Sequence, residues 1–438
     1  MDINELKNKK VSAISLGCDK NRVDLEKMLY NIKEFGFNVS PLVEDAQIII
    51  VNTCAFIQPA VVEAIETVLE AVHRKELGVE KVIVTGCLFS RYGEEIKNSL
   101  PMVDAYVDLK DNDKIVNIIA KLYGIDLNVE YKDGRLLTSQ PHFAFLKIAD
   151  GCDNGCAYCT IPRIRGRYKS VPMESLIKEA KTLAKGGVKE LILVAQDTTR
   201  YGIDLYGEYR LVELIRELSK IKELHWIRLH YLYVEMVTDE LLDEIYNNPK
   251  VCKYIDVPFQ HIDDNILKSM NRRSSEQDIR NFIEKIHTKY PEISVRSTFI
   301  IGLPGEGRKE FKKLLEFLKE ARLDLVGFFP FCREEKTKAF YMKKQVSGFV
   351  KKRRLKKAQD VQEQIMTANS INKIGDNVEI IVDFFDDVEQ YYVGRASNQS
   401  PDVDLFVLLD ASSNVKPGEF YNVRITDYMF GFFKGEVI

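Results

Sequence analysis

The sequence predicts an α/β protein in three parts: a parallel-sheet domain, a larger (β/α) barrel and a small β-barrel. Two observations support this. Short apolar runs alternate with segments of helical spacing through residues 1–130 and again through 138–370, and short strands separated by turns fill residues 371–438. The length of 438 residues also fits about three domains of roughly 150 residues each. We therefore expect the domains to be 1–130, 138–370 and 371–438.

The composition narrows the class of protein. Hydrophobic residues make up 45% and charged residues 29%, which excludes collagen-like, coiled-coil and low-complexity chains. The net charge of −3 argues against a general polyanion binder. No apolar run approaches the ~18 residues that span a membrane. The charged residues 1–10 do not resemble a secretory signal, so we expect a cytoplasmic protein without a membrane partner.

In the first domain, three apolar runs read as strands and are followed by helical patterns. The expected strands are residues 11–16, 46–51 and 81–85, and the expected helices are 21–35, 60–72 and a stretch after Tyr92. Gly36 provides a stop signal for the first helix. Strands that alternate with helices predict βαβ units and a parallel, flavodoxin-like sheet.

Cysteines follow each of these three strands. Cys18 and Cys54 are 36 residues apart, and Cys54 and Cys87 are 33 apart, which fits one βα unit per cysteine. Because parallel strands end at one edge of a sheet, the three thiols are expected to converge there. Disulfides are not expected, since the cytoplasm keeps thiols reduced. The alternative is three unrelated core cysteines.

The second domain repeats the strand and helix alternation. The expected strands are residues 143–148, 191–195, 226–229, 254–257, 295–301 and 325–330, with helical patterns at 175–184, 210–219 and 275–288. This rhythm predicts a partial or complete (β/α) barrel. Such barrels carry their active site at the C-terminal ends of the strands.

A cluster of three cysteines, Cys152-x3-Cys156-x2-Cys159, follows the first strand of this domain. Three thiolates are one fewer than the four that close an iron–sulfur cluster, and a closed zinc site would also need a fourth ligand. The spacing, with Tyr158 before the last cysteine, resembles the radical S-adenosylmethionine (SAM) signature. That resemblance implies an open iron that chelates SAM, and reductive cleavage of SAM to a 5′-deoxyadenosyl radical. A structural zinc knuckle is the alternative.

Further strand ends in this domain resemble the same family. The strings are Val194-Ala195-Gln196-Asp197, Asp256 to His261, and Ile300 to Glu306 with its Gly302-Leu303-Pro304-Gly305 turn. The resemblance implies cofactor-binding roles for Tyr158, Gln196, Gln260, Arg296 and Gly302. His261 alone is more typical of a buried structural histidine.

The C-terminal part opens with a basic stretch and continues as an acidic β domain. Six of the seven residues 351–357 are Lys or Arg, which indicates either a solvated helix face or an anion or RNA contact. Expected strands at 378–384, 390–396, 405–409 and 419–428 resemble the small TRAM β-barrel. Residues 371–438 hold five basic and twelve acidic side chains. An acidic barrel repels RNA and attracts basic proteins.

Together the three parts resemble the methylthiotransferases, which replace a C–H bond with C–SCH3. The resemblance implies two four-iron clusters, one held by Cys152, Cys156 and Cys159 and the other, the auxiliary cluster, by Cys18, Cys54 and Cys87. It also implies that one SAM molecule methylates sulfur on the auxiliary cluster while a second supplies the radical, with an external electron donor. Cys252 and Cys332 match neither set, and we expect them to be ordinary small side chains.

Two branches of that family differ in substrate. Strings such as Ser15 to Asn21, Asn52 to Ile57, Gly86 to Tyr92 and Ala195 to Gly202 resemble the branch that modifies the β-carbon of an aspartate in small-subunit ribosomal protein twelve. Phe331-Cys332 departs from its usual pattern. The acidic tail independently favours this basic protein as the docking partner. The alternatives are a tRNA adenosine (2-position) methylthiotransferase, favoured by the basic stretch, and a non-enzymatic iron–sulfur carrier.

Overall fold

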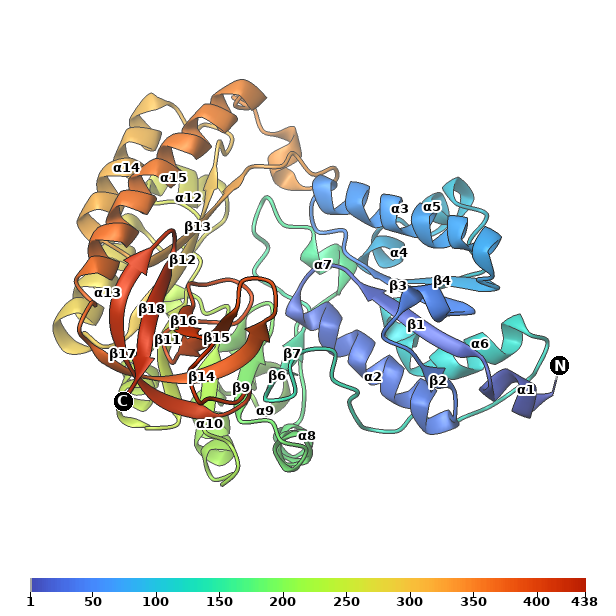
Figure 1. Cartoon of the computed structure of the whole chain (residues 1–438). Helices are drawn as coiled ribbons and strands as arrows, with labels where there is room; N and C mark the ends of the chain where they lie inside the picture. Colours follow the sequence, from blue (N-terminus) through green and yellow to red (C-terminus); the bar gives the residue numbers. More distant parts are fainter. Residues whose placement is uncertain (1) are drawn as a thin grey trace. The chain divides into compact units, whose positions relative to one another are not determined.

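The computed structural model describes residues 2–438 and divides the chain into two compact units. The first comprises residues up to Thr138 with Asp150–Gly155 and Cys159–Lys169. The second comprises Ser139–Ala149, Cys156–Tyr158 and Ser170–Ile438. Figure 1 shows their elements. Among the described residues, no helix combines the length and the hydropathy needed to span a membrane.

A five-stranded sheet of the order β2-β1-β3-β4-β5, parallel throughout, forms the core of the first unit. Its strands are β1 (Lys10–Ser15), β2 (Asn38–Val39), β3 (Ile48–Thr53), β4 (Lys81–Gly86) and β5 (Ala105–Val107). Its helices are α1 (Ile3–Lys7), α2 (Asp19–Phe35), α3 (Gln58–His73), α4 (Cys87–Tyr92), α5 (Glu94–Ser99), α6 (Ile115–Leu122) and α7 (Ile161–Ile164). The order 2-1-3-4-5 is the flavodoxin-like arrangement, so the predicted fold is confirmed.

Strand β3 shows why the sheet needs helices on both faces. All six of its residues are buried. Ile48 and Ile50 belong to the apolar cluster formed with α2 and α6, whereas Ile49 and Val51 belong to the cluster formed with α3 and α4. Successive side chains of a strand point to opposite faces, so a fully apolar strand is stable only between two helical layers.

The second unit contains a six-stranded parallel sheet of the order β13-β12-β11-β10-β9-β6. Its strands are β6 (Phe143–Lys147), β9 (Glu190–Val194), β10 (Trp226–Leu229), β11 (Val251–Asp256), β12 (Ser294–Ile301) and β13 (Leu325–Pro330). The helices are α8 (Met173–Lys185), α9 (Ile203–Tyr206), α10 (Leu211–Ser219), α11 (Asp239–Asn247), α12 (Asp264–Ser269), α13 (Glu276–Lys289), α14 (Arg308–Ala321) and α15 (Gly348–Ile371). The sheet is open, so of the two forms predicted the barrel is the partial one. A separate short pair joins β7 (Ala149–Asp150) and β8 (Lys169–Ser170).

A closed five-stranded β-barrel of the order β14-β15-β16-β18-β17 ends the chain, as predicted. Its strands are β14 (Asn377–Asp386), β15 (Tyr391–Ala396), β16 (Val407–Asp410), β17 (Phe420–Met429) and β18 (Phe432–Val437). Strand β18 had no counterpart among the expected strands. It follows β17 after a two-residue turn at Phe430 and Gly431, both with positive φ, which matches a tight hairpin.

A buried chain of charges joins this barrel to the sheet of the second unit. The Arg395 guanidinium contacts Glu190 at 2.6 Å and Asp383 at 2.7 Å. Asp383 also contacts His142 at 2.7 Å, and Glu190 accepts from Arg228 at 2.6 Å. Burial alone would raise the pKa of Glu190, but Arg395 and Arg228 hold it below its ordinary value. Arg395 therefore neutralises one carboxylate from each side of the junction.

Replacing Arg395 is expected to destabilise the second unit strongly. Arg395→Ala leaves two buried carboxylates without their shared cation, which costs about 3–5 kcal/mol of unfolding free energy. The matched control is Lys356→Ala, which breaks the exposed pair with Asp360 and should leave the unfolding free energy nearly unchanged, because exposed ion pairs contribute little. Urea unfolding of both variants measures the difference. Equal losses would contradict a special role for Arg395.

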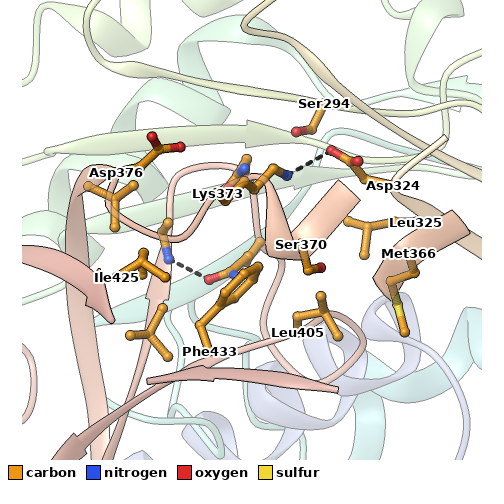
Figure 2. A pocket seen from close by; sticks show the side chains of 15 residues that line it. Ser294, Asp324, Leu325, Met366, Ser370, Lys373, Asp376, Leu405, Ile425 and Phe433 are labelled. Atoms are coloured by element: carbon orange, nitrogen blue, oxygen red, sulfur yellow. Dashed lines mark hydrogen bonds and ion pairs between the residues drawn. The ribbon is translucent and has the colours of Figure 1, made fainter. Parts of the chain in front are cut away.

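A cavity of about 140 Å³ lies at the same junction, between the sheet, α15 and the barrel (Figure 2). Most of its wall is apolar, including Leu325, Met366 and Phe433. Its polar rim includes the Lys373–Asp324 ion pair at 2.9 Å. Its lining includes no cysteine and none of the residues predicted to bind cofactor, so we interpret it as a packing gap.

Candidate functional site

Three cysteines of the first unit, Cys18, Cys54 and Cys87, follow neighbouring strands of its sheet. Cys18 directly precedes α2, Cys54 follows β3, and Cys87 begins α4 after β4. Strands β1, β3 and β4 are adjacent, and the pairs Ser15↔Asn52 and Thr53↔Gly86 put their ends in register. The shared edge that the spacing predicted is therefore present, because all three strands run in the same direction.

Two glycines bring these strand ends into close approach. Gly17 has φ +91°, and a Cβ there would lie 2.7 Å from the Cys54 Cβ and 3.0 Å from its Sγ. Gly86 has φ +92°, and a Cβ there would lie 2.4 Å from the Thr53 carbonyl oxygen. Only glycine tolerates both the left-handed backbone and the missing space. The cysteine that follows each glycine is thereby held close to the end of β3.

The thiols influence one another electrostatically. Burial, together with negative charge on Cys18 and Cys54, raises the pKa of Cys87 to about 12, although Arg165 lowers it. Burial also raises the pKa of Cys54. Within residues 2–438, no three His, Cys, Asp or Glu side chains converge on a point that could hold a single metal ion. Three thiols at neighbouring strand ends suit a multi-iron cluster, in which each sulfur binds a different iron.

Arg165 is a buried cation beside these thiols that the sequence did not reveal. Its guanidinium donates to the Cys87 Sγ at 3.8 Å and is anchored by Asp24 at 3.1 Å and Asp150 at 2.8 Å. It also donates to the side-chain oxygen of Asn21. A guanidinium next to a sulfur stabilises its thiolate form, which is the form that binds metal.

Asn21 ties the same strand ends together. Its Nδ2 donates to the carbonyl oxygens of Leu16 at 3.1 Å and Thr53 at 2.9 Å. Its Oδ1 accepts from the Cys87 thiol at 3.6 Å. Because buried amides need all of these partners, the side chain fixes the distance between β1 and β3.

The second group of cysteines, Cys152, Cys156 and Cys159, lies on the loop between β7 and α7. The loop begins with Gly151 at φ +76°, where a Cβ would lie 2.1 Å from the Arg167 carbonyl oxygen. The Ile161 N–H donates to the Cys159 Sγ at 3.4 Å. Donors aimed at sulfur favour the thiolate, as iron ligation requires.

A second buried arginine contacts this loop. The Arg272 guanidinium donates to the Cys156 Sγ at 3.8 Å and to the Pro258 carbonyl oxygen at 3.0 Å. It also stacks on the Tyr233 ring, with 4.4 Å from its carbon to the ring centroid. Each cysteine group thus has one buried guanidinium on one of its sulfurs. Neither Arg165 nor Arg272 lies in a sequence pattern that predicts a contact with a cluster.

The residues predicted to bind cofactor occupy the second unit as follows. Gln196 follows β9, Gln260 follows β11 and Gly302 follows β12, all at the C-terminal edge of the sheet. Arg296 lies inside β12, where Asp256 at 3.4 Å and Asp404 at 3.2 Å contact its guanidinium. Tyr158, on the cysteine loop, packs against the apolar cluster around Leu303.

Gln260 has a backbone conformation that points to a constrained site. Its φ is +70°, which is unusual for a residue with a side chain. Hydrogen bonds to Thr298 and Ile300, each 2.8 Å, hold it against β12. At Gly302 the space for a side chain is filled by Lys351, whose Cγ would lie 2.4 Å from an added Cβ. Strain of this kind persists where the surrounding structure enforces it, often at functional sites.

Three known families match three separate stretches of the chain. The radical SAM superfamily matches residues 146–318, the uncharacterized protein family UPF0004 matches residues 10–108, and the TRAM domain matches residues 374–438. The UPF0004 match covers Cys18, Cys54 and Cys87, and the radical SAM match covers the Cys152 to Cys159 loop.

Curated relatives cover almost the whole chain. A ribosomal protein uS12 methylthiotransferase RimO from Thermoanaerobacter sp. (strain X514) is 42% identical over 96% of this chain and 98% of its own length. The protein of the same description from Caldanaerobacter subterraneus subsp. tengcongensis is 44% identical over 95% and 97%. Among solved structures, the radical SAM methyltransferase TsrM from Kitasatospora setae has a TM-score of 0.55 at 14% identity, covering 73% of each chain, which shows a shared fold alone.

Proposed function

The chain belongs to the RimO family of ribosomal protein uS12 methylthiotransferases, and from this we propose that it transfers a methylthio group to the β-carbon of an aspartate in uS12. It is a radical SAM methylthiotransferase, an enzyme that uses SAM and iron–sulfur clusters. Family membership sets aside the interpretation as a simple iron–sulfur carrier. The observation that carries the proposal is the set of three thiols at adjoining strand ends, in addition to the Cys-x3-Cys-x2-Cys loop.

The two sets of three cysteines fit two clusters that would have different roles. Cys152, Cys156 and Cys159 would hold the cluster that contacts SAM, and the three cysteines at the strand ends would hold the auxiliary cluster. Three protein thiolates leave one iron open in each, and such a cluster supplies electrons for SAM cleavage or a site for an added sulfur. We propose two SAM molecules per turnover, one as methyl donor and one as radical source, and an external electron donor.

The chain's own residues prepare both sites. Arg165 and Arg272 donate to one sulfur in each group and compensate negative charge in a buried environment. Gly17 and Gly86 allow the thiols to approach one another. We propose that Tyr158, Gln196, Gln260, Arg296 and Gly302 position SAM, a role supported by the location of Gln196, Gln260 and Gly302 at the C-terminal edge of the sheet.

The acidic barrel supports a basic protein as the substrate. Asp387, Glu389 and Asp402 are exposed on its loops, and Asp410 is exposed at the end of β16. Ribosomal proteins are basic because they bind RNA, so opposite charge would steer uS12 toward this barrel. We place the reaction in the cytoplasm, where ribosomal proteins are made.

The test is direct methylthiolation in vitro. The protein is loaded anaerobically with iron and sulfide, given SAM and dithionite, and offered uS12 or bulk tRNA in separate reactions. We expect uS12 to gain about 46 Da, the mass of SCH3 replacing H, on one aspartate. A gain on tRNA adenosine and none on uS12 would replace this proposal with the tRNA alternative.

The basic stretch of residues 351–357 supports the tRNA alternative less than its sequence indicates. Arg354 is buried, and it donates to the carbonyl and carboxylate oxygens of Glu306, both at 2.7 Å. Lys351 donates to the Phe331 carbonyl oxygen at 2.6 Å. Two of the six cations therefore stabilise the fold and are not available to a phosphate backbone.

A further inference from the structure

A strongly basic surface lies on residues 329–357, which we call the basic segment. Nine of its basic side chains are exposed, against a single exposed acidic one, Glu335. The nine are Arg333, Lys336, Lys338, Lys343, Lys344, Lys352, Arg353, Lys356 and Lys357. In a chain of net charge −3, this is a local concentration of one sign. Exposed cations clustered in one segment are an electrostatic mark of phosphate binding.

Exposed aromatic rings lie among these cations. Phe329 is 53% exposed, Tyr341 72% and Phe349 76%. Large apolar side chains at such exposure lose hydrophobic stabilisation, so several in one basic segment need a reason. Rings interleaved with lysines are the pattern that binds unpaired RNA, because bases stack on the rings while cations follow the backbone.

Contacts within the second unit place the basic segment at the C-terminal edge of the sheet. The Lys344 carbonyl oxygen accepts from the Gly305 N–H at 3.0 Å, and the Lys351 stem fills the space beside Gly302. Glu306 accepts from the Gly302 N–H at 2.7 Å and from Arg354, which fixes the start of α15. Figure 1 shows α15 leading on toward β14 of the barrel. The basic surface thus borders the edge where the cofactor residues are predicted.

We propose that the basic segment binds ribosomal RNA of the small subunit, so that the enzyme recognises its protein substrate in an RNA-bound state. This rests on the proposed function. The second unit then carries two surfaces of opposite charge, an acidic barrel that would bind a basic protein and a basic, aromatic segment that would bind RNA. A substrate made of both components would satisfy both charges at once.

The experiment measures binding of the iron-loaded, full-length enzyme to small-subunit ribosomal RNA over a range of salt concentrations. The test variant carries Lys343→Gln, Lys344→Gln, Lys352→Gln and Arg353→Gln, all at exposed positions. We expect at least a tenfold loss of affinity. The slope of log affinity against log salt should fall by about 3, since each phosphate contact on a single strand contributes roughly 0.7. A second variant, Tyr341→Ala with Phe349→Ala, should weaken binding with little change in slope.

The matched control carries four Lys→Gln changes at other exposed positions of the same unit, namely 178, 181, 185 and 222. Loss of affinity in this control equal to that of the test variant would overturn the proposal, as would unchanged binding of the test variant. Tighter binding of bulk tRNA, or binding of anionic lipid vesicles in place of RNA, would also overturn it. Methylthiolation of free uS12 by the unaltered enzyme is measured in parallel, so failure of the proposed function is seen separately.

Discussion

We expect Cys156→Ala to abolish SAM cleavage, so that the 5′-deoxyadenosine formed with dithionite falls to background. The loop supplies three thiolates, and Cys156 is the one that Arg272 contacts at 3.8 Å. With two thiolates a four-iron cluster loses a ligand that the chain does not replace. Iron per chain should fall from about eight to about four, because the auxiliary site is untouched. Iron content, visible absorption and 5′-deoxyadenosine yield are the measurements.

The control for this variant is Cys332→Ala. Cys332 is half-buried like Cys156 and lies outside both cysteine groups. We expect it to retain both the iron content and the 5′-deoxyadenosine yield. An unchanged yield in Cys156→Ala, or an equal loss in Cys332→Ala, would refute the assignment of the SAM-contacting cluster to this loop.

The cysteine positions could be predicted because their signals are local. Cys18, Cys54 and Cys87 each follow a short apolar strand, two of them directly after a glycine, and parallel strands end at one edge of their sheet. Arg165 could not be found in this way. It is 78 residues from Cys87, and only the fold brings its guanidinium to that sulfur. A side chain whose partners are distant in sequence leaves no periodic or spacing signal.

The basic stretch shows a different limit. Its composition suggested one charged surface, but Lys351, Arg354 and Ala358 are spaced along one face of α15, and that face packs against the 302–306 turn and the sheet. The spacing of three and four residues is visible in the sequence. The sequence does not show why Arg354 is buried. The Glu306 carboxylate, which pairs with it, provides the reason.

Cys54→Ala is expected to separate the two sites. The variant should still produce 5′-deoxyadenosine at the level of the unaltered protein, because the loop cysteines remain. It should yield no product heavier by about 46 Da, because the auxiliary group has lost a thiolate. Iron per chain should again fall to about four, as in Cys156→Ala. The two variants would then have equal iron content and opposite effects on SAM cleavage.

The geometry explains why Cys54 is the informative position. Its Cβ and Sγ pack against Gly17. Cys54 follows β3, which lies between β1 and β4, so the change to alanine removes the middle ligand of the three. It is less buried than Cys87, so the change to alanine should disturb the core less. An unchanged thermal unfolding midpoint would confirm this. Full methylthiolated product from a folded Cys54→Ala enzyme would exclude a sulfur-carrying role for the group of Cys18, Cys54 and Cys87 and leave these three thiols as structural residues.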